Sequence, residues 1–209
     1  MFVLGLTGSI GMGKTVTARL FAEAGVPVHD ADAAVHRLYE AEAVPAIESA
    51  FPGTTQGGKV DRGKLAARVL DDPAAIKRLE AIVHPLVRAS AARFLAAVAA
   101  QGARVAVLDI PLLFETGGDA RVDAVVVVSA PPEVQRARVL ERPGMTPAKL
   151  DAILRQQMPD SEKRARAHFV VDSSRGVDSA REQVHGILRS LAALPGRRTG
   201  DRRQRTEDG

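Results

Sequence analysis

The chain has 209 residues, of which 45% are hydrophobic, 26% charged and 3% aromatic, and it contains no cysteine. This composition is too apolar for an intrinsically disordered chain, and the lack of thiols excludes a disulfide framework, thiol catalysis and cysteine-ligated zinc. The sequence shows no run of about 18 apolar residues, the length of a membrane span, so we expect a cytoplasmic globular protein without a membrane partner.

The net charge of +4 favours anionic partners. The tail 196–209, with five arginines against three acidic residues, supplies half of it, and we expect this tail to be disordered. Six Phe, one Tyr and no Trp leave little material for stacking nucleic-acid bases. We therefore expect small anionic ligands and no nucleic-acid partner, and we favour a monomer.

Five short apolar segments are predicted to be strands. They are Phe2–Thr7, Val26–His29, Val105–Ile110, Ala124–Ser129 and Phe169–Asp172. Helical patterns alternate with them, starting at Lys14 to about Ala24 and closing near Val177–Leu194. This alternation predicts an α/β fold in which helices flank a five-stranded parallel sheet.

Two longer stretches between these strands are mostly helical. Residues 33–100 are predicted to form a helical insertion, and the charged stretch 131–167 a mobile lid. Breaks in the insertion are expected at Pro45, Pro52–Gly58, Asp72-Pro73 and Pro85. We expect residues 1–195 to form one domain, with a core made of residues 1–32, 101–130 and 168–195.

The strongest motif is Gly8-Ser9-Ile10-Gly11-Met12-Gly13-Lys14-Thr15, which matches G-x-x-x-x-G-K-[ST] between a predicted strand and a predicted helix. Glycines let successive backbone N–H groups converge on phosphate oxygens, and the start of the helix adds favourable partial charge. Lys14 is expected to reach the β- and γ-phosphates, and the Thr15 hydroxyl to bind Mg²⁺. The motif predicts that the chain binds a nucleoside triphosphate, with all eight residues around its phosphates.

Two carboxylates, Asp30 and Asp32, follow the second predicted strand, at the edge of the sheet where ligands bind in such folds. A carboxylate there can accept the proton of a substrate hydroxyl that attacks the γ-phosphate, which favours a small-molecule kinase over a switch or a motor. The alternative is structural, with Asp30 capping a helix and Asp32 complementing its dipole. Position alone leaves both interpretations open.

Other charged residues are placed to meet a triphosphate. Asp109 ends the third predicted strand and can hold Mg²⁺ directly or through water. Arg138 and Arg142 are four residues apart in the lid and share one face if the lid is helical there. Arginines on a closing lid stabilise the charge of phosphoryl transfer, although a solvated basic face is the commoner use of such residues.

Several separated motifs occur in the order found in the dephospho-CoA kinase family, which the chain resembles from Leu4 to about Leu194. They are Gly5-Leu6-Thr7-Gly8, Asp30-Ala31-Asp32, Val60-Asp61-Arg62, Leu79-Glu80-Ala81-Ile82-Val83-His84-Pro85, Asp109-Ile110-Pro111-Leu112-Leu113-Phe114-Glu115, the spaced Gln135, Arg138 and Arg142, and Gln157. The Gly8–Thr15 motif, a P-loop, occurs in many families of nucleotide-binding proteins. The Asp-x-Pro-Leu-Leu-Phe-Glu and Glu-x-x-x-His-Pro strings are far more specific to this family.

The resemblance implies a P-loop kinase fold, with transfer of the ATP γ-phosphate to the 3′-hydroxyl of dephospho-CoA, which gives CoA and ADP. It implies ATP and Mg²⁺ as ligands and Asp32 as the base or hydroxyl-orienting group. Arg138 and Arg142 then belong to the catalytic set, as lid residues that face ATP.

The resemblance also implies an acceptor site. Asp109 and Glu115 would lie near the acceptor and the metal, and the helical insertion with Arg62 and His84 would bind the CoA side. The alternative for His84 is an ordinary residue at a helix end, with Pro85 starting the next helix.

Two positions depart from the family pattern. His168 stands where an acidic residue commonly precedes the last strand, and Ser173 where Asn is frequent in the loop after that strand. This puts adenine contacts from Ser173 or Ser174 in doubt. The rival hypotheses are another P-loop kinase acting on a nucleoside, nucleotide or sugar, and a nucleotide-dependent switch or nucleic-acid-binding module.

Overall fold

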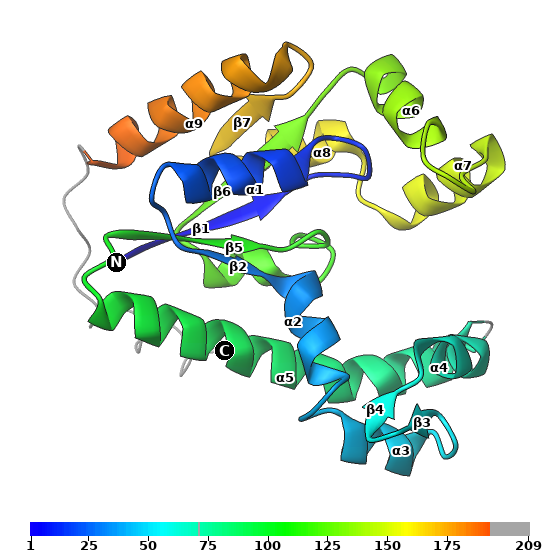
Figure 1. Ribbon diagram of the computed structural model, residues 1–209. Helices are drawn as coiled ribbons and strands as arrows, with labels where there is room; N and C mark the ends of the chain where they lie inside the picture. The colour runs from blue at the N-terminus through cyan, green and yellow to red at the C-terminus, as the bar shows by residue number, and fades with distance from the viewer. Residues whose placement is uncertain (71, 193–209) are drawn as a thin grey trace. The chain divides into compact units, whose positions relative to one another are not determined.

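The computed structural model of the protein describes residues 1–70 and 72–192 (Figure 1). These residues form two compact units. The first, here the sheet unit, contains Met1–Val28 and the described residues from Val98 onward; the second, here the helical unit, is His29–Ala97. The helical unit covers nearly the same stretch as the insertion expected over residues 33–100. The predicted tail lies outside the described residues.

Five strands form one sheet in the order β2-β5-β1-β6-β7, and the pairs β1–β5, β1–β6 and β6–β7 are parallel. The strands are β1 (Phe2–Thr7), β2 (Val28–Asp30), β5 (Val105–Asp109), β6 (Ala124–Ser129) and β7 (Phe169–Asp172). The five-stranded parallel sheet predicted from the sequence is confirmed. Three of its strands have the predicted bounds, whereas β5 ends one residue earlier and β2 begins two residues later than predicted.

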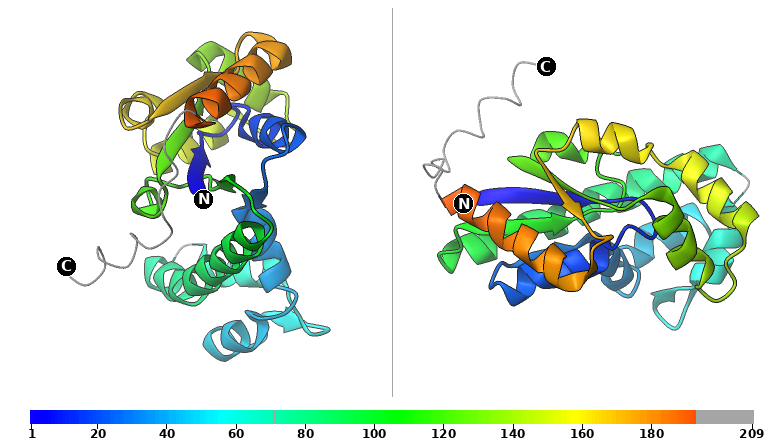
Figure 2. Two further views of the ribbon diagram at one scale, coloured as in Figure 1. Left: turned by 90° about the vertical axis from the view of Figure 1, so that its left-hand side faces the viewer. Right: turned by 90° about the horizontal axis from the view of Figure 1, so that it is seen from above.

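Alternate residues of β6 face two different cores, as the pleat of a strand requires. Ala124, Val126 and Val128 belong to the larger core, which α1 (Lys14–Glu23) and α9 (Gly176–Ala192) cover. These two helices lie side by side on that face of the sheet (Figure 1, Figure 2). Val125 and Val127 face a smaller core with Leu113, Phe114, Met158 and Ala167.

His168, one of the two departures from the family pattern, begins the pairing of β7 with β6. Its backbone N–H donates to Val125 O at 2.9 Å, and its Nδ1 accepts from Val125 N–H at 3.2 Å. The imidazole nitrogen thus fills an acceptor role that a carboxylate would fill equally well. The departure at this position is therefore structural.

The helical unit packs around its own core. Its elements are α2 (Ala31–Leu38), α3 (Val44–Ala50), β3 (Thr55–Gln56), β4 (Lys59–Val60), α4 (Arg62–Val69) and most of α5 (Pro73–Ala100). The short antiparallel pair β3–β4 lies in and beyond the stretch expected only to be a turn. Its two-residue connection is Gly57-Gly58, both with positive φ (59° and 75°), which is the chemistry of a tight hairpin turn.

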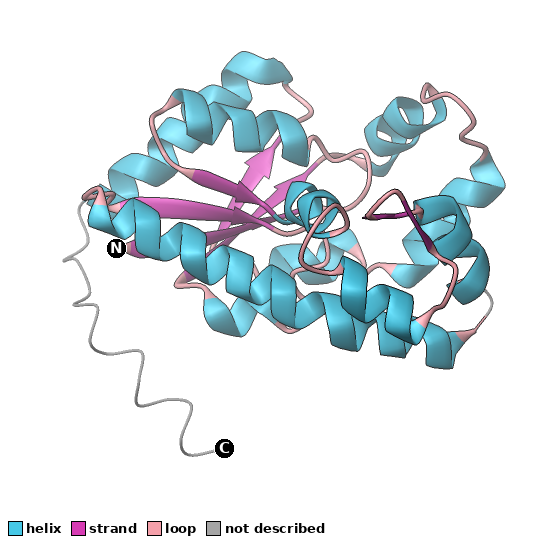
Figure 3. Ribbon diagram, turned by 60° about the horizontal axis from the view of Figure 1, so that its bottom comes forward, coloured by secondary structure: helices cyan, strands magenta, loops and turns pink. Residues whose placement is uncertain are grey.

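Helix α5 runs without interruption through Pro85, so the predicted break there is wrong (Figure 3). A proline inside a helix removes one hydrogen bond, but here the residues around it pack on the core of the helical unit: Leu79, Ile82, Val83, Leu86 and Val87. The expected break at Asp72-Pro73 is confirmed, because Asp72 Oδ1 accepts from Ala74 and Ala75 N–H and Pro73 starts the helix.

By length and composition, α5 is also the one helix in the described residues that is long and apolar enough to cross a membrane. The premise that no stretch of the sequence is long and apolar enough to span a membrane is therefore wrong by this measure. A single helix of this kind is weak evidence for a membrane span.

The predicted lid 131–167 contains three helices, α6 (Pro132–Leu140), α7 (Pro147–Gln156) and α8 (Asp160–Ala165). Helix α8 packs on β6, and its Lys163 side chain is fully buried. Helix α6 ends two residues before Arg142, so the condition under which Arg138 and Arg142 would share one helix face is not met.

Candidate active site

The P-loop connects β1 to α1 at the carboxyl edge of the sheet. Thr7 Oγ1 donates to Pro111 O at 2.9 Å and so joins the ends of β1 and β5. Gly8 has no room for a side chain, because an added Cβ would lie 2.7 Å from the Val128 carbonyl oxygen. Gly11 and Gly13 have positive φ (77° and 87°), which glycine adopts without strain.

Three carbonyl groups of the loop accept hydrogen bonds, one from within the loop and two from side chains elsewhere in the fold. Ser9 O accepts from Met12 N–H at 3.1 Å. Ile10 O accepts from Gln135 Nε2 at 2.7 Å, and Met12 O accepts from Ser173 Oγ at 2.8 Å. In a trans peptide the C=O and the following N–H point in opposite directions. The Gly11 and Gly13 N–H groups are therefore turned away from Gln135 and Ser173.

No described residue accepts a hydrogen bond from the Gly11 or Gly13 N–H. Gly13 is also the N-cap of α1, so the unpaired amides of the first turn of this helix lie beside them. Converging amides at a helix start form an anion site. The loop as folded is thus prepared for phosphate oxygens.

Lys14 and Asp109, the two charged residues predicted nearest the phosphates, are brought together. Lys14 Nζ lies 2.6 Å from Asp109 Oδ1, and the side chains are 16% and 5% exposed. Thr15, in contrast, is exposed at the start of α1. Within residues 1–70 and 72–192 no three His, Asp or Glu side chains cluster as a metal site.

Arg138 is the lid arginine that the fold attaches to the P-loop. Its Nη1 donates to Ser173 Oγ and its Nη2 to Ser173 O, each at 2.8 Å. Ser173 Oγ in turn donates to Met12 O, so one hydroxyl bridges the arginine and the loop. Arg142 lies beyond the end of α6 and is exposed. The fold therefore fixes Arg138 and leaves Arg142 at the surface of the lid.

Two glutamines on either side of Ile10 were not predicted as site residues. Gln135, on α6, donates to Ile10 O, and Gln157, at the end of α7, accepts from Ile10 N–H at 3.2 Å. Both had appeared in the sequence only as parts of a family motif. The signal that could have identified them is their position, with Arg138, in the lid segment that was expected to close over the P-loop.

Glu115 is engaged by groups of the protein. Its Oε1 lies 2.9 Å from Lys163 Nζ and accepts from Met158 N–H at 2.9 Å. Partial burial opposes ionisation of this carboxyl, but the bonds from Lys163 and Met158 outweigh it and hold the pKa of Glu115 below its usual range. The ion pair joins the loop after β5 to α8.

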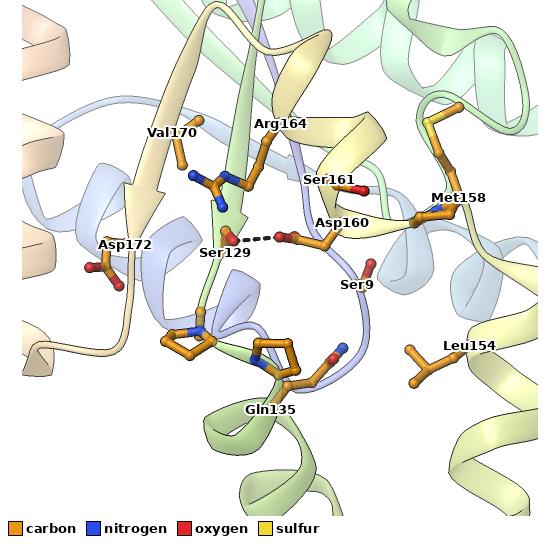
Figure 4. A pocket seen from close by; sticks show the side chains of 14 residues that line it. Ser9, Ser129, Gln135, Leu154, Met158, Asp160, Ser161, Arg164, Val170 and Asp172 are labelled. Carbon is orange, nitrogen blue, oxygen red and sulfur yellow. Dashed lines mark hydrogen bonds between the residues drawn. The ribbon is translucent and has the colours of Figure 1, made fainter.

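A cavity of about 640 Å³ lies next to the P-loop between the two ends of the lid (Figure 4). Its lining includes Ser9 and Gln135, the linkers at Pro131 and Pro159, and Arg164. Ser129 Oγ donates to Asp160 Oδ2 at 2.7 Å among the lining residues and joins the end of β6 to the start of α8. Ser9 of the P-loop lines the cavity, whereas Lys14 and Thr15 do not.

Three predicted site residues lie in the helical unit, and all are exposed. Asp32 is in the first turn of α2, where the neighbouring Asp30 is the cap, its Oδ1 accepting from Ala33 N–H at 3.0 Å. Arg62 begins α4, with Nη1 3.3 Å from Nε2 of His36. His84 precedes Pro85 on α5. Capping thus accounts for Asp30, and Asp32 lies in the first turn of α2, where a carboxylate complements the helix dipole, as the structural alternative predicts.

The sheet order and the P-loop between β1 and α1 define the fold of a P-loop kinase. Solved structures agree: a Thermus thermophilus protein matches with a TM-score of 0.78 and 38% identity, covering 93% of this chain and 98% of that one. A shikimate kinase from Acinetobacter baumannii (TM-score 0.51, 20% identity, covering 92% of this chain and 93% of that one) shares the fold.

The sequence comparisons identify the family. The dephospho-CoA kinase family model matches residues 2–179. Dephospho-CoA kinases of Rhodopseudomonas palustris and Bradyrhizobium diazoefficiens are 67% and 66% identical to the chain, in each case over 95% of this chain and the whole of the relative. The chain belongs to the dephospho-CoA kinase family.

Proposed function

We propose that the protein transfers the γ-phosphate of ATP to the 3′-hydroxyl of dephospho-CoA, giving CoA and ADP. Besides family membership, the observation that carries this proposal is the P-loop, with its carbonyls held outward and its Gly11 and Gly13 amides unpaired. Phosphoryl transfer depends chiefly on positioning and on electrostatic stabilisation, which such a cradle supplies.

Lys14 is proposed to move from Asp109 to the β- and γ-phosphates when ATP binds. An ammonium 2.6 Å from a carboxylate is already placed at the edge of the sheet, and a phosphate is a stronger anionic partner. The Asp109 carboxylate and the exposed Thr15 hydroxyl are oxygen donors of the kind that suits Mg²⁺, which takes only one or two protein ligands beside phosphates and water. Bound there, Mg²⁺ would neutralise charge that develops on the phosphates.

Asp32 is proposed as the base or orienting group for the 3′-hydroxyl. Its neighbour Asp30 is used as the helix cap, whereas Asp32 is an exposed carboxylate two residues beyond the end of β2. A general base must come within hydrogen-bonding distance of the proton that it accepts. We propose that this contact forms when both substrates are bound.

The remaining residues divide between the two substrates. Arg138 and Arg142 are proposed to stabilise the transferring phosphate from the lid, with Arg138 already held beside the loop by Ser173. Arg62 and His84 are proposed to bind dephospho-CoA on the helical unit, where a guanidinium suits its diphosphate. Contact of Glu115 with the acceptor stays a prediction; its bonds to Lys163 and Met158 favour a positioning role.

The proposed reaction fits a monomeric cytoplasmic enzyme whose partners are ATP and dephospho-CoA. It requires neither a membrane nor a nucleic acid. Gel filtration with light scattering, and fractionation of cells that express the chain, test the monomer and the location directly.

An acceptor panel tests the reaction. Purified protein with ATP and Mg²⁺ is offered dephospho-CoA, adenosine, AMP and shikimate, and ADP release is followed together with the mass of the product. We expect rapid turnover with dephospho-CoA alone and a product heavier by one phosphoryl group. A preference for any other acceptor, or a phosphate at a position other than the 3′-hydroxyl, would contradict the proposal.

A further inference from the structure

Both backbone polar groups of Ile10 are bound by side chains from the lid segment Pro132–Gln157. Gln135 Nε2 donates to Ile10 O at 2.7 Å, and Gln157 Oε1 accepts from Ile10 N–H at 3.2 Å. Gln135 is buried, with 7% of its surface exposed. A Cβ added to Gly11 would lie 2.4 Å from Val139 Cγ2 and 3.1 Å from Gln135 O, so α6 lies directly against the loop.

Gln135 and Gln157 have the same amide side chain, but the two hydrogen bonds use opposite ends of it. Gln135 must donate, because its partner is a carbonyl oxygen, and Gln157 must accept, because its partner is an N–H. Together they fix the orientation of the two peptide planes that flank Ile10. With Ile10 O turned toward Gln135, the Gly11 N–H is turned the other way.

We infer that Gln135 and Gln157 are positioning residues for the ATP phosphates. They hold the P-loop in the orientation that presents the Gly11 N–H, and they join the loop to both ends of the α6–α7 segment. A flip of the Ile10–Gly11 peptide would present a carbonyl oxygen to a phosphate instead of a donor. This inference rests on the proposed use of the loop for ATP.

The same substitution at the two positions separates their roles. Gln135→Glu replaces a donor with an ionised acceptor facing Ile10 O, and we expect the Kd for a non-hydrolysable ATP analogue to rise roughly tenfold or more, the range for leaving a buried polar group unpaired. Gln157→Glu keeps the acceptor, so we expect a Kd within about twofold of that of Gln156→Glu, a charge-matched control on the exposed neighbour. Gln157→Met removes the acceptor that faces Ile10 N–H, so we expect it to raise the Kd well above that of Gln157→Glu. Titration calorimetry at neutral pH measures all four variants.

Two further readouts separate positioning from general loss of structure. Acidification toward pH 5 protonates a glutamate at 135 and restores a donor, so the affinity of Gln135→Glu relative to wild type should recover. In turnover assays of Gln135→Glu, the KM for ATP should rise while the KM for dephospho-CoA stays unchanged. If Gln135→Glu does not fold, Gln135→Met removes the donor at similar size and should give the same weakening.

Two results would overturn the inference: ATP affinity of Gln135→Glu and Gln135→Met within about twofold of wild type, or equal weakening by Gln135→Glu and Gln157→Glu. If the wild-type chain itself binds no ATP analogue, the proposed function fails, and this inference with it. The calorimetric measurement therefore distinguishes the two failures.

Discussion

The sheet unit and the helical unit present their candidate functional groups in different ways. In the sheet unit the candidate phosphate-binding groups include the backbone amides of Gly11 and Gly13, which follow loop carbonyls held by Gln135 and Ser173. In the helical unit the candidates Asp32, Arg62 and His84 are side chains on helix surfaces, and all are exposed. In the sheet unit the orientation of the candidate groups is fixed by hydrogen bonds of the fold. In the helical unit we expect the candidate side chains to be ordered by a bound substrate.

This difference implies different consequences of substitution. Buried contacts of the sheet unit support the fold as well as the site, so changing them should alter stability. Exposed residues of the helical unit contribute little to folding, so changing them should alter activity alone. Substitutions in each unit, with stability and activity measured together, test this difference.

Asp32→Asn should give the largest effect. Loss of a general base typically lowers kcat by about 10²–10⁴-fold, and the thermal midpoint should not move, because the residue is exposed. Asp30→Asn is the matched control: asparagine still caps α2, so both activity and stability should persist. Near-wild-type kcat for Asp32→Asn, or an equal loss for Asp30→Asn, would show that the chemistry lies elsewhere.

Glu115→Ala should give the largest loss of stability. It leaves the fully buried Lys163 ammonium without its partner, which typically lowers the free energy of unfolding by about 3–5 kcal/mol. The exposed pair Lys59–Glu40 in the helical unit is the contrast, and Glu40→Ala should change it by about 0–1 kcal/mol. Urea denaturation followed by circular dichroism compares the two, and similar losses for both variants would contradict the contrast.

His29 should give the helical unit a modest sensitivity to acid. Burial lowers the pKa of His29 below its usual value of 6.5, and Arg37 lowers it further. The unfolded chain therefore binds a proton near pH 6.5 while the folded chain does not, so stability present above that pH is lost as the pH falls through the folded pKa.

His29→Asn should weaken this dependence between pH 7 and pH 5. Glu115, whose pKa is lowered from 4.5, contributes stability that is lost below that range, so the two groups are distinguishable. Denaturation curves at several pH values measure the slope, and an unchanged slope in the variant would assign the acid sensitivity to another group.

Local patterns predicted much of this molecule. The runs Phe2–Thr7, Ala124–Ser129 and Phe169–Asp172 are strands with the predicted bounds, because buried parallel strands are continuous apolar runs. The P-loop was recognisable because its function needs glycines at fixed spacing. Lys14 and Asp109 were both identified, but their contact follows from the pairing of β1 with β5.

Features set by long-range contacts were not predictable in the same way. The bonds of Gln135 and Gln157 to Ile10 join positions more than 120 residues apart. The continuation of α5 through Pro85 depends on packing that outweighs a local helix-breaking residue. The Ser173 hydroxyl contacts Met12 and Arg138 only because β7 pairs with β6.

We propose that the sheet unit binds ATP and the helical unit binds dephospho-CoA. The KM values for both substrates in Lys14→Ala and Arg62→Ala test this proposal most directly. Arg62→Ala should raise the KM for dephospho-CoA roughly tenfold or more, as expected for a lost charge-assisted bond to phosphate, and leave the KM for ATP within about twofold. Lys14→Ala should raise the KM for ATP and lower kcat. A rise in the KM for ATP in Arg62→Ala, with that for dephospho-CoA unchanged, would contradict the account.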